Sequence, residues 1–227
     1  MGYERHAEPF DERGFETRLR AIQAETKGIY GPPSALVHAL TKAAYLTQQD
    51  LAPVFAFSPH GEASEPQVLL QFELFYFFAH LALRSAAAVG TSESRIRALH
   101  AYTGTWLASA AVDAFFVHWP DDLKRGIANE FYDKLNTAQA EYAECAEVYS
   151  NSDPLATNTL FGLFAQNAAS LWERQDDART RALVARTTMR AYQGIPLPAL
   201  VAEAAEVIES VDIEFVQQFL GWRLTSA

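Results

Sequence analysis

The stretch QFELFYFFAHLALR, Gln71 to Arg84, places a Glu, a His and an Arg inside an apolar run rich in aromatic residues. In a helix with 3.6 residues per turn, Glu73, Phe77, His80 and Arg84 fall on one narrow face. Apolar and aromatic residues cover the other faces, which is typical of a helix at the centre of a fold. Because an unpaired buried charge is costly, the ionisable side chains are expected to find partners on neighbouring helices.

Candidate partners lie on a helix predicted from Pro120 to about Tyr149. Its apolar stripe includes Asn136, Gln139 and Tyr142, and Glu141 lies next to it. Polar groups on facing helices either fix the pairing of those helices or line a ligand pocket. The predicted polar network or pocket consists of Glu73, Tyr76, His80, Arg84, Asn136, Gln139 and Tyr142.

Helical periodicity extends over most of the chain, and no segment alternates with period two for long enough to predict a strand. The prediction is an all-α protein, an antiparallel helical bundle with flanking helices in a single domain of residues 1–227. The core bundle is placed at residues 66–172, with N-terminal helices over 11–46 and C-terminal helices over 176–222 packed around it. The stretch DLAPVFAFSPHGEASEP, with three prolines, is predicted to be a connector.

Composition excludes several classes of partner. The chain has 227 residues and a formal net charge of −10, with no cluster of Lys and Arg. Such a surface repels phosphates, so neither nucleic acid nor an anionic membrane surface is an expected partner. Charged residues interrupt the longest apolar run, and MGYERHAEPFDERG lacks the apolar region of a secretory signal. A cytoplasmic location is therefore expected.

Motifs for common chemistry are missing from the sequence. A di-iron bundle needs Glu-x-x-His, but none of the six histidines has a Glu three residues before it. The single cysteine, Cys145, permits neither an intrachain disulfide nor a Cys-x-x-Cys motif. No dinucleotide-binding motif, P-loop or Gly-x-Ser-x-Gly motif occurs. We expect no metal and no cofactor, and whether the protein is an enzyme stays open.

Two functions follow from these patterns. The first is association, either with a second copy or with a protein partner, in which the predicted C-terminal helix at about 198–222 offers a dimer interface besides its role in core packing. The alternative is a small-molecule or catalytic pocket. In that pocket His80 would be the acid or base, Glu73 would orient it, and Arg84 would contact an anion. A cleft beside His80 would favour the second function.

Three segments, FELFYFFAHLALRSAA, FYDKLNTAQAEYAECAEVY and TLFGLFAQNAASLW, resemble a family of uncharacterised bacterial all-helical proteins. In that family an acidic residue precedes a Tyr-Phe-Phe-x-x-His-Leu run ending in Asp-Arg, and a later helix carries Asn-x-x-Gln-x-Glu-Tyr. The resemblance covers about residues 66–172, and Leu83 stands here where the family has the Asp. It implies a helical fold and a bacterial cytoplasmic origin, and no activity.

Overall fold

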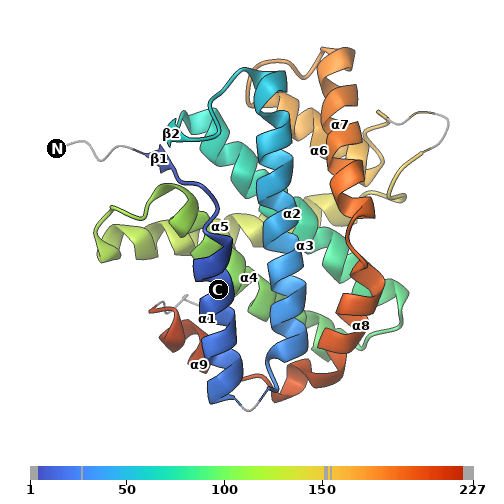
Figure 1. Ribbon diagram of the computed structural model, residues 1–227. Helices are drawn as coiled ribbons and strands as arrows, with labels where there is room; N and C mark the ends of the chain where they lie inside the picture. Colours follow the sequence, from blue (N-terminus) through green and yellow to red (C-terminus); the bar gives the residue numbers. More distant parts are fainter. Residues whose placement is uncertain (1–4, 27, 151–152, 154, 222–227) are drawn as a thin grey trace.

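A computed structural model describes residues 5–26, 28–150, 153 and 155–221 and confirms the all-α, bundle-like packing (Figure 1). The one sheet among these residues pairs two short antiparallel strands, β1 (His6–Ala7) and β2 (Gly61–Glu62). The helices are α1 (Glu12–Glu25), α2 (Gly31–Phe55), α3 (Glu65–Ala88), α4 (Glu93–Phe115), α5 (Asp121–Ala143), α6 (Leu160–Ser170), α7 (Ala178–Gln193), α8 (Leu197–Val207) and α9 (Ile213–Phe219). None of these helices is long and apolar enough to cross a membrane.

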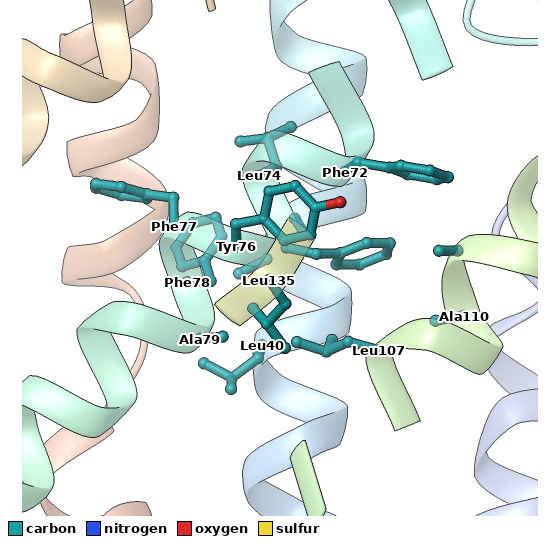
Figure 2. Packing of buried hydrophobic residues seen from close by; sticks show 14 of the residues in the cluster. Leu40, Phe72, Leu74, Tyr76, Phe77, Phe78, Ala79, Leu107, Ala110 and Leu135 are labelled. Carbon is teal, nitrogen blue, oxygen red and sulfur yellow. The ribbon is translucent and has the colours of Figure 1, made fainter. Parts of the chain in front are cut away.

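The helix α3 is buried on nearly all sides. Ser64 precedes it and Pro66 lies in its first turn, where the fixed φ and missing N–H of proline suit a helix. It packs against α2, α4, α5, α6 and α8, and its aromatic side chains leave it in several directions (Figure 2). The ring of Phe77, for example, is fully buried, and its centroid lies 5.1 Å from that of Phe161 and 4.5 Å from that of Phe164, both on α6.

The long helix α2 runs through the middle of the view in Figure 1 and packs against α3, α4, α7 and α8. The sequence predicts that it ends near Leu46 and that a connector follows, but the helix continues to Phe55 and contains Pro53. A proline inside a helix removes one backbone hydrogen bond and costs about 3 kcal/mol. Leu51 and Phe55 are buried, and their burial offsets that cost.

Two further helix boundaries differ from the sequence prediction. The helix α5 ends at Ala143, not near Tyr149, and Arg84 donates to backbone carbonyls just beyond this end. The sequence also predicts a helix start at Asp153 and Pro154. Pro154 lies outside the described residues, and α6 begins at Leu160, where the Thr159 side chain caps it by accepting from the Gly162 amide.

The predicted C-terminal helix is interrupted. Ile208–Ser210 form a 3₁₀ turn between α8 and α9, and Asp212 caps α9 by accepting from the Phe215 amide at 3.1 Å. The Asp212 amide donates to the hydroxyl of buried Tyr30 at 2.7 Å, which fixes the break against the start of α2. Trp222, the predicted end of the helix, lies outside the described residues.

The closest approach of α4 and α5 depends on Gly104. A Cβ atom at this position would lie 2.6 Å from Tyr132 Cε2 and 2.9 Å from Leu135 Cδ2. Leu135 is fully buried, so it has little room to move away. Gly126, also inside a helix, has no such neighbour within 4 Å.

We expect Gly104→Ala to destabilise the protein by about 1–3 kcal/mol, because overpacking outweighs the higher helix propensity of alanine. Gly126→Ala, the matched control, should stabilise it by about 0.5–1 kcal/mol. Urea denaturation followed by circular dichroism measures both changes. Equal stabilisation by the two substitutions would show that α4 and α5 do not approach each other at Gly104.

Candidate functional site

Glu73 joins α3 to two other helices. The hydroxyl of Tyr142 on α5 donates to Glu73 Oε1, and the Asn167 amide on α6 donates to the same oxygen at 3.3 Å. Tyr142 is fully buried and Glu73 is half-buried. Burial raises the pKa of Glu73 above its ordinary value, although both hydrogen bonds act in the opposite direction. Burial also raises the pKa of Tyr142, so its hydroxyl keeps the proton that it donates.

His80 has a different partner. Its Nδ1 lies 2.9 Å from Gln139 Oε1 on α5, and the Gln139 amide donates to the Tyr76 carbonyl at 3.2 Å. Because Gln139 Oε1 can only accept, Nδ1 carries a proton, and in the neutral imidazole Nε2 then carries none. Nε2 is buried and has no hydrogen-bond partner among the described residues. Burial lowers the pKa of His80, with a further contribution from the charge of Arg84.

Arg84 binds backbone and not a carboxylate. Its Nη1 donates to the Cys145 carbonyl and its Nη2 to the Ala146 carbonyl, each at 2.7 Å. The fork of the guanidinium suits two neighbouring acceptors, and carbonyls just beyond the end of α5 attract a cation. Arg84 therefore fixes the chain where it leaves α5.

The structure places the other predicted residues in different surroundings. Asn136 is exposed and its Oδ1 lies 2.7 Å from His100 Nε2 on α4, away from Glu73. The Tyr76 ring is buried against Phe131, and its hydroxyl has no hydrogen-bond partner among the described residues. Glu73, His80 and Arg84 thus have separate partners. A functional role for the predicted set stays a prediction.

Sequence reasoning missed Asn167, the partner of Glu73 on α6. Its amide also lies 3.4 Å from Glu141 Oε1. The available signal was a pair of neighbouring amides, Gln166 and Asn167, in the mostly apolar segment LFGLFAQNAAS. The distance in sequence between Glu73 and Asn167 hides the pairing, which only the packing of α6 on α3 creates.

A cavity of about 560 Å³ lies between the N-terminal segment, α1, α2 and α4. Three aromatic rings form one wall. Phe10 stacks on Tyr45 with centroids 4.4 Å apart, and Phe15 lies 5.8 Å from Phe10. The Tyr45 hydroxyl donates to the Ala110 carbonyl at 3.1 Å, which fixes the ring. We call this space the N-terminal cavity.

Ionisable groups line the rest of the N-terminal cavity. Arg18 and Asp113 form an ion pair at 2.6 Å, with side chains 38% and 35% exposed. His118 Nε2 lies 3.4 Å from Glu8 Oε1, and Asp11 accepts from the Gly14 amide. The buried Nε of Arg18 has no hydrogen-bond partner among the described residues. The sequence contained no pattern for this cavity, since its walls come from distant segments.

Glu12, Glu16 and His38 could together hold a metal ion, the one such group among the described residues. Glu12 and Glu16 lie one turn apart on α1 and face His38 on α2. Lys42 Nζ lies 2.6 Å from Glu12 Oε1. The hydrogen bond from Lys42 lowers the pKa of Glu12, so this carboxylate stays charged.

A pH-dependent stability difference is expected for Glu73→Gln. A raised folded-state pKa means that the unfolded chain loses the proton first, so folding opposes ionisation and wild-type stability falls as pH rises above about 4.3. The amide oxygen that the substitution introduces can still accept from Tyr142. The gain in unfolding free energy of the variant over the wild type should therefore increase from about pH 4 to about pH 8.

Urea denaturation across that range measures the difference, and Glu203→Gln, at an exposed position of α8, is the surface control. If the gain at Glu73 does not change with pH, burial does not oppose its ionisation.

His80→Gln should show the opposite trend. A lowered folded-state pKa means that the unfolded chain takes up the proton first, so the wild type loses stability as pH falls below about 6.5. The variant has no such proton and should lose less. Its stability relative to the wild type is expected to rise from about pH 7 to about pH 5.

Thermal unfolding at several pH values measures this trend, with exposed His60→Gln as the matched control. Parallel curves for wild type and His80→Gln would contradict a buried, neutral His80.

Comparison of the chain with protein-family models, with curated proteins and with solved structures found no match. The resemblance to uncharacterised bacterial all-helical proteins therefore stays a prediction. Function must be argued from the geometry described above.

Proposed function

We propose that this protein binds a small organic cation with an apolar body in the N-terminal cavity. The observation that carries the proposal is the cavity itself, about 560 Å³ with an aromatic wall and several ionisable groups. Ligand pockets for small molecules have volumes of roughly 300–1,000 Å³ and combine apolar walls with a few polar groups. The composition of the cavity fits that description.

The charge of the lining favours a cation. Glu8, Asp11 and Asp113 supply three carboxylates, and Arg18 supplies one guanidinium. The lining stays negative whether or not His118 carries a proton. The formal charge of the whole chain is also negative, so the surrounding field attracts cations.

The aromatic wall supplies a second attraction. A cation over an aromatic face gains about 0.5–2 kcal/mol, more when water is excluded. The guanidinium of Arg18 already lies over the Phe15 ring, 5.7 Å from its centroid. Phe10, which is half-buried and stacks on Tyr45, offers further ring surface beside it. An amine attached to a flat or branched hydrocarbon would contact both rings and carboxylates.

The pocket predicted beside His80 has less support. Glu73, His80 and Arg84 contact side chains and backbone of α5, α6 and the segment after α5. In the part of the chain that the structure describes, the N-terminal cavity and two smaller pockets are lined by other residues. Association with a second copy or a partner stays a prediction. Large exposed hydrophobic residues such as Leu46, Leu123 and Leu183 lie on different helices.

Calorimetric titration of the full chain with 2-phenylethylamine tests the proposal, and 2-phenylethanol and 3-phenylpropionate serve as neutral and anionic controls. We expect the amine to bind best. Asp11→Asn keeps the helix cap but removes one charge, so it should weaken amine binding about two- to fivefold. Glu206→Gln, at an exposed position of α8, should leave amine binding unchanged. Equal binding of the three probes, or no saturable binding at millimolar concentration, would overturn the proposal.

A further inference from the structure

We propose that Glu12, Glu16 and His38 bind a divalent transition-metal ion such as Zn²⁺ between α1 and α2. The inference is separate from the proposed function, because Glu12 and Glu16 leave α1 toward His38 on α2, whereas Asp11, Gly14 and Arg18 line the N-terminal cavity. The donor set is one imidazole and two carboxylates. Zinc takes these ligand types and commonly has three protein ligands with water in the fourth position.

Distances from His38 Nε2 to the two carboxylates fit a shared ion. His38 Nε2 lies 3.6 Å from Glu12 Oε1 and 3.8 Å from Glu16 Oε1, and the three ligand atoms all lie within 4.8 Å of one another. Two ligands that are each about 2.0–2.2 Å from a tetrahedral ion lie about 3.4 Å apart. The pairs from His38 are therefore too long for hydrogen bonds and are within a few tenths of an ångström of the spacing around an ion.

The state of His38 supplies an independent observation. Its Nε2 is buried and has no hydrogen-bond partner among the described residues, yet it faces the two carboxylates. An unsatisfied buried nitrogen is costly, and a metal ion would satisfy it. The imidazole packs against the Phe15 ring with centroids 6.2 Å apart and rings inclined by 28°, which holds it toward α1.

Lys42 competes with the ion for the same oxygen. Its Nζ lies 2.6 Å from Glu12 Oε1 and balances part of the negative charge. The Lys42 side chain is 45% exposed, so it can turn into solvent when an ion enters. Metal binding therefore displaces an ammonium from Glu12. This exchange gives the proposal a consequence that a simple ion-pair cluster does not have: removal of Lys42 should strengthen metal binding.

The experiment is calorimetric titration of the metal-free full chain with Zn²⁺, with Co²⁺ absorption as a second readout of ligand geometry. We expect one saturable site. Loss of a ligand in His38→Gln or Glu16→Gln should weaken binding at least about tenfold. Lys42→Gln should bind several-fold more tightly than the wild type. His60→Gln, at an exposed histidine in the β2 region, is the matched control and should leave affinity unchanged.

Circular dichroism checks that each variant is folded, and Glu16→Gln keeps the test decisive if His38→Gln does not fold. The proposal is overturned by the absence of saturable binding. It is also overturned if binding survives both ligand substitutions, or if Lys42→Gln does not tighten binding. Either result would mean that the four side chains, Glu12, Glu16, His38 and Lys42, form only an ion-pair cluster between two helices.

Discussion

Burial of α3 on nearly every side is the constraint on which the rest of the structure depends. The central turns of such a helix expose little surface, so the ionisable residues Glu73, His80 and Arg84 need partners from neighbouring elements. Glu73 binds Tyr142 and Asn167, His80 binds Gln139, and Arg84 binds the backbone after α5. These bonds fix where α5 and α6 lie against α3. They are most simply understood as directional contacts within a core that is otherwise aliphatic and aromatic.

The spacing of the polar groups along α3 does not favour a shared catalytic site. Its polar groups contact different partners in turn, from the α6 side at Glu73 to the end of α5 at Arg84. A catalytic set needs its groups within reach of one substrate atom. Here Glu73 and Arg84 bind other parts of the protein, whereas the side chains of Arg18 and Asp113 in the N-terminal cavity are 38% and 35% exposed.

Much of the fold was predictable from local sequence. Ser64 and Pro66 mark the start of α3, and the spacing of Phe15, Leu19 and Ile22 predicts α1 with its buried side. The extension of α2 through Pro53 was not predictable, because burial of the last turn overrides the local preference. For the site, the link between His80 and Gln139 fits the predicted facing of α3 and α5. The placement of Asn136 does not, since this residue, three positions before Gln139 on α5, contacts His100 of α4 and not α3.

Both candidate binding sites depend on the attachment of α1, and neither was visible in the sequence. Phe15 is the residue that they share: its ring lines the N-terminal cavity, packs against His38, and meets Trp106 of α4 edge-on at 5.8 Å. Leu19 and Ile22, also buried, hold the following turns of α1 in place. Polar residues on opposite sides of this apolar stripe then face the cavity or α2. Helical periodicity identifies the stripe, but only the packing of α1 on α2 and α4 determines which polar residues meet. The position of α1 thus places polar residues of one amphipathic helix beside residues of α2 and α4 in both candidate sites.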